Sequence, residues 1–338
     1  HVIVINICGI LAMPYFLTMF TSDTTIVNLG VDYSNIILCF TIINMIGITF
    51  EKIFQAIGKI IFSMISMISG CIVNIILDPI MIFGLGPIPA MGIKGAAYAT
   101  GIGQTVSMII YLIIYFRIPL NINISFKYIK EKIDLKLYTV GIPAILNMAL
   151  PSFLISALNG ILTNFSPMYV VVLGIYYKLQ TFIYMPANGI IQGMRPIMSY
   201  NYGAKEHDRV KEIYKISLIL IAGMMFIGMI LCFMIPNQLV GMFTDNLETL
   251  NAGVSAMKII SVGFVISAIS VTSCGALESF GKGVGSLMIS LLRYIVIIIP
   301  IAFFLSRICG VNGVWHGFWI TEIIVAILSC IIYFRIDK

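Results

Sequence analysis

Long apolar runs separated by short polar connections dominate the chain. Each run lasts roughly 16 to 27 residues, the length of helix that crosses about 30 Å of hydrocarbon at 1.5 Å per residue. A membrane-spanning barrel strand would instead alternate apolar and polar positions over about ten residues. The unbroken runs therefore predict spanning helices. Ten are expected, at 2–20, 35–50, 60–84, 95–116, 140–163, 168–194, 213–235, 254–277, 284–306 and 312–334.

The residue composition agrees with a lipid-facing chain. Apolar residues make up 60% of the sequence and charged residues 10%, and the mean hydropathy is +1.05. Lipid offers no partner for a free peptide group, so a chain of this composition must satisfy its backbone in helices. We expect an all-α integral membrane protein. The seven cysteines show no metal-ligand spacing, so neither a metal centre nor a cofactor is expected.

Basic residues are concentrated in two connections between the predicted helices, 117–139 and 195–212. The positive-inside rule places both connections in the cytoplasm. The two helices between them lead out of the cytoplasm and back, so the two assignments agree. We therefore expect a multi-pass protein of a cell membrane. The basic residues are Arg117, Lys127, Lys130, Lys132 and Lys136 in the first connection and Arg195, Lys205, Arg209 and Lys211 in the second.

Two short patterns recur in the same order beside helices of the same orientation. The pattern 91–96 (MGIKGA) is echoed at 309–314 (CGVNGV), about 218 positions later. The pattern 56–59 (AIGK) is echoed at 279–282 (SFGK), about 223 positions later. Transporters are often built from such repeats. We expect two pseudo-repeated lobes of six spans each, with the first half beginning roughly 90 residues before the first residue given, enough for two more helices.

Three stretches of the chain have the pattern of a known family. The run 74–84 (NIILDPIMIFG), followed by 91–100 (MGIKGAAYAT), is similar to the end of a fifth helix and the start of a sixth. The run 189–204 (GIIQGMRPIMSYNYGA) is similar to an eighth helix and the loop after it. The family that they resemble is the multidrug and toxic compound extrusion family. The resemblance extends over the whole chain and lacks only the first two of the family's twelve helices.

The resemblance implies a function and a domain organisation. It implies a secondary active exporter of the bacterial inner membrane, which antiports organic cations or amphiphilic drugs against H⁺ or Na⁺ by alternating access. Its partners would be a small cationic or amphiphilic molecule and the lipid bilayer, and we expect a monomer. The predicted parts are an amino-terminal lobe of helices three to six at 1–119, a cytoplasmic linker at 120–139, and a carboxy-terminal lobe of helices seven to twelve at 140–338.

Asp78 is a candidate for ion coupling. It lies inside a predicted span with Asn74 four residues earlier on the same helical face, and an acid within a membrane helix is functional by default. Thr100 would complete an oxygen-rich site of the kind that hard cations bind, so Na⁺ at Asp78 is one option and H⁺ the other. The alternative is that Asp78 only caps a helix end before Pro79. The resemblance implies that Asn74, Asp78 and Thr100 belong to a cation and proton network, whose partner acid on the family's first helix is not in this chain.

Three charged residues should lie near the middle of the membrane. Lys178, Arg293 and Glu322 each fall about nine to ten residues into a predicted span. An isolated charge at that depth costs several kcal/mol, whereas a paired charge need not. We expect an ion pair or a shared hydrogen-bond network between Lys178 and Glu322. It would serve either transport or the cohesion of the carboxy-terminal lobe.

Amide side chains are the remaining polar candidates. Gln180, Asn188 and Gln192 recur close to one helical face and are candidates for lining a central cleft. Asn147 is assigned to the same intramembrane polar network. Its span, 140–163, contains no Asp or Glu, unlike some family members that bind sodium there. This departure argues against sodium coupling in the carboxy-terminal lobe.

Prolines interrupt several of the apolar spans. Proline removes a backbone N–H and its ring clashes with the preceding turn, so it bends a helix. Pro143, Pro186 and Pro300 are therefore candidate hinges. Plain packing is the alternative, because membrane helices tolerate proline.

Other classes of function fit less well. A flippase for lipid-linked oligosaccharides is the alternative within the same architecture, because Lys178 and Arg293 are cations that a pyrophosphate would need. A membrane-embedded enzyme would need clustered histidines, paired acids or a nucleophile with its base, and the sequence shows none of these. The run 205–211 is mixed in charge and favours a solvated loop, so nucleic acid is not an expected partner.

Overall fold

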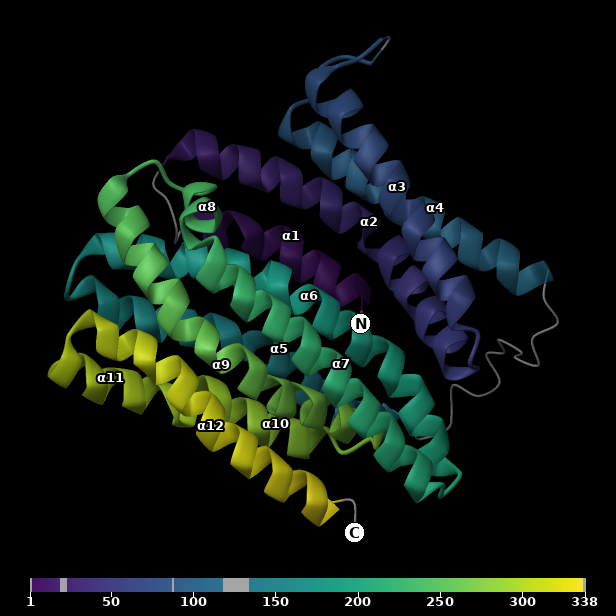
Figure 1. Ribbon diagram of the computed structural model, residues 1–338. Coiled ribbons are helices and arrows are strands. Elements are labelled where there is room, and N and C mark those ends of the chain that lie inside the picture. The colour runs from purple at the N-terminus through teal and green to yellow at the C-terminus, as the bar shows by residue number, and fades with distance from the viewer. Residues whose placement is uncertain (1, 19–22, 87, 118–133, 337–338) are drawn as a thin grey trace. The chain divides into compact units, whose positions relative to one another are not determined.

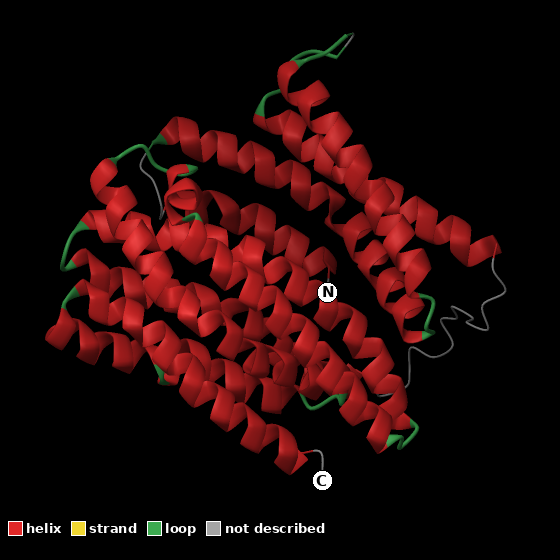
Figure 2. Ribbon diagram, viewed as in Figure 1, coloured by secondary structure: helices red, strands yellow, loops and turns green. Residues whose placement is uncertain are grey.

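The protein is described by a computed structural model that covers residues 2–18, 23–86, 88–117 and 134–336 (Figure 1). Within these ranges the chain is helical and contains no strand (Figure 2). The helices are α1 (Val2–Thr18), α2 (Thr24–Ala56), α3 (Ile60–Phe83), α4 (Ile93–Arg117), α5 (Asp134–Thr163), α6 (Pro167–Gly203), α7 (His207–Met234), α8 (Pro236–Gly241), α9 (Leu247–Ser279), α10 (Gly283–Leu291), the π-helical turn η2 (Leu292–Val296), α11 (Ile298–Cys309) and α12 (Val311–Ile336).

The predicted fold class is confirmed. Nine helical segments in the described ranges are long and apolar enough to cross a membrane, and α1 is a shorter apolar helix. One of the nine, Gly283–Cys309, is a single span made of α10, η2 and α11. The protein is therefore a multi-pass membrane protein. Most of the predicted linker 120–139 lies outside the described residues, and α5 already begins at its residue 134.

Two helices extend well beyond the apolar runs that predicted them. Helix α2 has 33 residues and begins directly after Asp23, whose side chain accepts hydrogen bonds from the N–H groups of Thr25 and Ile26. Such a helix is about 50 Å long and exceeds the hydrocarbon thickness. Helix α6 continues to Gly203, so the stretch 195–212 is mostly helical and not the loop that we expected. Hydropathy marks where lipid ends, whereas backbone hydrogen bonding marks where a helix ends.

The chain separates into two compact units, which we call the first unit (residues 1–125) and the second unit (residues 126–338). In the first unit, α4 packs against both α3 and α2, and α1 packs against α2. Helices α3 and α4 touch through their backbones: a Cβ atom on Gly70 would lie 2.6 Å from the Gly103 carbonyl oxygen. Membrane helices use small residues at such contacts because they allow close approach.

Helix α9 lies at the centre of the second unit. It packs against α6, α7, α10 and α12, and half of its spanning window is buried. The span beside it is interrupted by the π-turn η2, where the N–H of Ile297 donates to the carbonyl of Leu292 at 3.0 Å, five residues back. Pro300 follows this turn within α11. π-turns insert one residue into a helix and are frequent at functional sites.

The two repeated sequence patterns build the same backbone turns. Gly58 and Gly281 both adopt positive φ angles, of +75° and +72°, which favour glycine. Gly95 and Gly313 both lie against a helix end: an added Cβ would stand 2.3 Å from the Met81 carbonyl oxygen in one case and 2.1 Å from that of Leu305 in the other. The repeats read from the sequence therefore correspond to repeated local structure in the two units.

Candidate functional site

The first unit contains a cavity of about 300 Å³ between α2, α3 and α4. Its apolar wall includes Ile48, Met67 and Cys71, and the closely packed Gly70 and Gly103 also line it. The polar residues around the cavity come from all three helices. They are Asn44, Glu51, Asn74, Thr100, Gln104, Ser107 and Tyr111.

The sequence-predicted coupling residues are brought together in part. Asn74 and Thr100 line the cavity from α3 and α4, and the Asn74 amide donates to the Asp78 carboxylate at 3.3 Å. The hydroxyl of Thr100 donates to the carbonyl of Ala96 at 2.9 Å and keeps its lone pairs free to accept. Helix α3 continues through Pro79 to residue 83, so Asp78 is an interior residue and not an end cap.

Sequence reasoning missed five of the seven polar residues of this cavity, Glu51 and Gln104 among them. Glu51 in α2 lies beyond the predicted span 35–50 and accepts hydrogen bonds from Gln55 at 2.8 Å and from Lys52 at 3.0 Å. Gln104 lies one helical turn after Thr100 and shares its face. The i, i+4 spacing from Thr100 was the available signal for Gln104. Glu51 was hidden because the helix runs past its apolar segment.

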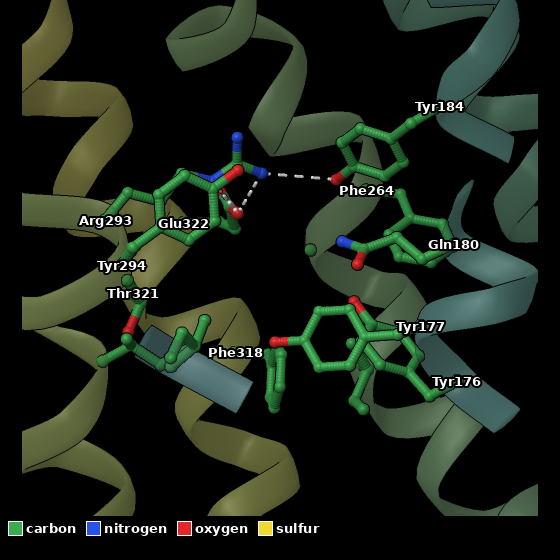
Figure 3. Close-up of a pocket in the computed structure, with 14 residues that line it drawn as sticks. Tyr176, Tyr177, Gln180, Tyr184, Phe264, Arg293, Tyr294, Phe318, Thr321 and Glu322 are labelled. Atoms are coloured by element: carbon green, nitrogen blue, oxygen red, sulfur yellow. Dashed lines mark hydrogen bonds and ion pairs between the residues drawn. The ribbon is translucent and has the colours of Figure 1, made fainter. Parts of the chain in front are cut away.

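The second unit contains a much smaller cavity, of about 30 Å³, surrounded by tyrosines (Figure 3). An ion pair forms one wall: Arg293 Nε donates to Glu322 Oε1 at 2.8 Å, and Nη2 lies 2.6 Å from the same oxygen. The Nη2 group also reaches the Tyr184 hydroxyl at 3.4 Å, as Figure 3 shows, and that hydroxyl lies 2.7 Å from Ser267 Oγ. The charges of Arg293 and Glu322 are thus neutralised within the second unit.

The expected pairing of Lys178 with Glu322 is wrong. Lys178 is exposed, and its Nζ lies 5.5 Å from the centre of the Phe243 ring. Its neighbours on α6, Tyr177 and Gln180, line the cavity instead. A helical position one residue from Tyr177 is rotated by about 100°, which turns Lys178 away from Glu322.

The other predicted polar residues do not form one surface. Gln180 lines the second-unit cavity, whereas Asn188 and Gln192 are exposed on α6. Asn147 joins a separate cluster: its amide donates to Glu278 at 3.3 Å and to Ser286 at 3.1 Å. Glu278 also forms an ion pair with Arg195. This cluster ties α5, α6, α9 and α10 together.

Comparison with known proteins identifies the family. The MatE family model matches residues 2–80 and 143–304, which is well over half of the chain. The chain belongs to the MatE family. Proteins of this family are transporters and not enzymes, and they need no cofactor. The family predicted from the sequence is therefore confirmed.

Curated relatives include the multidrug export protein MepA of Staphylococcus saprophyticus and of Staphylococcus aureus strain MRSA252. Each is 27% identical over 286 residues, which cover 84% of this chain. The chain spans 62% of the length of these relatives.

Solved structures show the same fold. A MATE crystal structure in the bent conformation has a TM-score of 0.89 at 20% identity, and covers 99% of this chain and 75% of its own. An outward-facing multidrug resistance MATE transporter has a TM-score of 0.90 at 21% identity, with the same coverage. A transporter of the MOP superfamily from Pyrococcus furiosus reaches 0.91 at 20% identity, again covering 99% of this chain and 75% of its own.

Proposed function

We propose that this protein is a secondary active multidrug exporter. It moves organic cations or amphiphilic drugs out of the cell in exchange for H⁺ or Na⁺, by alternating access between its two units, and acts as a monomer. Membership of the MatE family and similarity to MepA support the efflux activity. The observation that carries the coupling proposal is Asp78, a carboxylate inside a membrane-spanning helix that is hydrogen-bonded to Asn74 on the wall of the first-unit cavity.

Asp78 does not line the first-unit cavity itself but is hydrogen-bonded to Asn74 on its wall, and this arrangement fits ion coupling. Asp78 offers a carboxylate that can bind a proton or a hard cation, and Asn74 and Thr100 add neutral oxygens of the type that such cations bind. Binding of either ion removes the net negative charge of Asp78. Exchange with a cationic substrate then follows, because the two positive charges compete for one carboxylate.

The cavity also fits a small amphiphilic substrate. Its volume of about 300 Å³ lies at the lower end of ligand pockets, which are mostly apolar with a few placed polar groups. Met67 gives an adaptable apolar surface, and Glu51 places a carboxylate on the cavity wall, paired with the Lys52 ammonium at 3.0 Å. The basic connections 117–139 and 195–212 face the cytoplasm in this proposal.

Movement between the two access states requires bending or sliding of helices. Pro143 and Pro186 lie inside α5 and α6, and Pro300 lies beside the π-turn η2. Each removes one backbone hydrogen bond, which lowers the cost of bending there. We propose these prolines as the hinges.

The flippase alternative is not favoured. Arg293 is buried at 9% exposure and neutralised by Glu322, and Lys178 lies over an aromatic ring. Arg293 is therefore not available to a pyrophosphate, and Lys178 lies apart from it rather than forming a second cation beside it. The family comparison points to efflux of small molecules.

Efflux from proteoliposomes tests the proposal. The full-length protein is reconstituted with a fluorescent cationic dye, and an H⁺ or Na⁺ gradient is imposed across the membrane. We expect gradient-driven efflux that is lost in Asp78→Asn and kept in Asp245→Asn, a matched change at an exposed carboxylate. Efflux from Asp78→Asn at the wild-type rate would refute coupling at Asp78. Folded protein that transports under neither gradient would refute the exporter proposal.

A further inference from the structure

The second-unit cavity contains polar groups that have no partner within the described residues. The hydroxyls of Tyr177 and Thr321 are both buried and line the cavity, yet neither makes a hydrogen bond. Thr321 is only 1% exposed. A buried hydroxyl without a partner is costly, and the usual solution is an ordered water. The cavity volume of about 30 Å³ has room for one or two water molecules.

The two carboxylate oxygens of Glu322 differ in the number and closeness of their hydrogen-bond and ion-pair contacts. The Nε–H of Arg293 donates to Oε1 at 2.8 Å, and Nη2 lies 2.6 Å from the same oxygen. The other oxygen, Oε2, has only the Ser270 hydroxyl at 3.4 Å. A carboxylate oxygen can accept about two hydrogen bonds. Oε2 therefore keeps free capacity next to a cavity that fits water.

Arg293 has alternative partners if Glu322 becomes neutral. Its guanidinium carbon lies 5.4 Å from the centre of the Tyr294 ring and 5.9 Å from that of the Tyr184 ring. Both rings are within cation–π range, and Nη2 already reaches the Tyr184 hydroxyl. The positive charge thus stays stabilised without the carboxylate. An ion pair with such a second set of partners can exist in two states.

Among the residues that line the second-unit cavity, Glu322 is the one with an acidic side chain. Helix α6 contributes Tyr176, Tyr177 and Tyr184, and η2 contributes Arg293 and Tyr294. Helix α9 places the hydroxyls of Ser267 and Ser270 beside the pair and brings no charged side chain to the cavity, and α5 brings Leu154. Glu322, from α12, is the carboxylate among the lining residues.

We propose that Glu322 is a proton-binding site in the second unit, reached through water bound in the Thr321 and Tyr177 cavity. A hydronium ion passes its proton through this water to Oε2, which leaves water in the cavity and a neutral carboxylic acid. The Arg293 guanidinium then moves onto the Tyr184 and Tyr294 rings. Deprotonation reverses both steps. This site is independent of the coupling assigned to Asp78 and of transport itself.

Infrared difference spectroscopy of the purified full-length protein tests the site. Acidification should produce the C=O band of a protonated carboxylic acid that is lost in Glu322→Gln and kept in Glu248→Gln, a change at an exposed glutamate. An unchanged set of bands in Glu322→Gln would overturn the proposal. Because a single change can impair folding, the double variant Arg293→Met/Glu322→Met serves as a second test, since buried ion pairs tolerate paired apolar replacement. It should lose the same band, and retention of the band would also overturn the proposal.

The water route has its own test. Thr321→Val keeps the shape of the side chain and the ion pair but removes the hydroxyl that holds water. We expect the carboxylic acid band to reach the wild-type amplitude with a rate after a pH jump that is several-fold slower. An unchanged rate would overturn the route through this cavity.

Discussion

The two units place different side chains at matching positions of the repeat. Gly70 follows Lys59 by the same number of residues as Arg293 follows Lys282. Gln104 likewise follows Gly95 as Glu322 follows Gly313. In the first unit the small and neutral pair accompanies a cavity of about 300 Å³, and in the second unit the charged pair accompanies one of about 30 Å³.

The difference shows how one repeated architecture can enclose two different interiors. Gly70 lets α3 and α4 meet backbone to backbone and leaves the space beside Asn74 open. In the second unit, Arg293 stands on a π-turn and crosses to Glu322, so the equivalent space is mostly filled by side chains. The repeated turns set the helix arrangement, and the residues at two positions decide whether the interior holds a ligand-sized cavity or a closed polar core.

The largest expected effect comes from breaking the charged pair on one side only. Arg293→Met leaves the Glu322 carboxylate buried without its partner, and we expect a loss of about 3–5 kcal/mol in the free energy of unfolding. The loss should shrink on acidification, because protonation neutralises the remaining charge. Thermal unfolding in detergent measures it, with Arg293→Met/Glu322→Met as the matched control near wild-type stability. A single variant as stable as wild type would mean that the pair does not hold the second unit together.

A change at Gly70 should break the corresponding contact in the first unit. A Cβ there would lie 1.9 Å from the Ser107 Oγ and 2.6 Å from the Gly103 carbonyl oxygen. Gly70→Ala should therefore cost about 1–3 kcal/mol through overpacking. The control is Gly174→Ala in α6, where an added Cβ meets nothing within 4 Å. Equal stability of the two variants, measured by thermal unfolding, would contradict the close helix contact.

A substitution that gives the first unit the acidic residue of the second unit tests the comparison of the two cavities directly. Gln104→Glu puts an acid at the position that corresponds to Glu322, but without an arginine to neutralise it. We expect tighter binding of a cationic dye by about 1 kcal/mol, or roughly fivefold, measured by fluorescence polarisation. Gln238→Glu adds the same charge at an exposed residue and should leave the affinity unchanged. Equal gains in both variants would show a general effect of net charge and not a property of the cavity.

The smallest expected effect concerns Lys178. The sequence predicted an ion pair with Glu322, and breaking a buried pair would be strongly destabilising. The structure places its ammonium group over Phe243 at the surface, so Lys178→Met should cost at most about 0.5–1 kcal/mol. Thermal unfolding distinguishes the two. A loss as large as that of Arg293→Met would restore the predicted pairing.

Sequence reasoning predicted the positions of the helices better than it predicted which polar side chains interact with one another. Apolar length and the positions of Gly58, Gly92 and their counterparts indicate where helices lie and turn, because those features are local. Asn74 and Asp78 were found for the same reason, as a pair four residues apart on one helix.

Which residue a charged side chain pairs with depends on the direction in which that side chain points once the helices have packed. Lys178 and Arg293 looked equivalent in depth, but a π-turn directs one of them inward and helical rotation turns the other away. The sequence pattern contains no sign of that turn. Glu51 was missed because polar residues beyond the hydrocarbon continue a helix without extending its apolar run.

The backbone contact between α3 and α4 has a mechanical consequence. Helices separated by a layer of side chains can slide, because rotamers adjust as they move. At Gly70 and Gly103 there is no such layer, since each backbone lies against the other. We therefore expect α3 and α4 to move together as one rigid piece, so that a displacement of either helix carries both Asn74 and Thr100 with it.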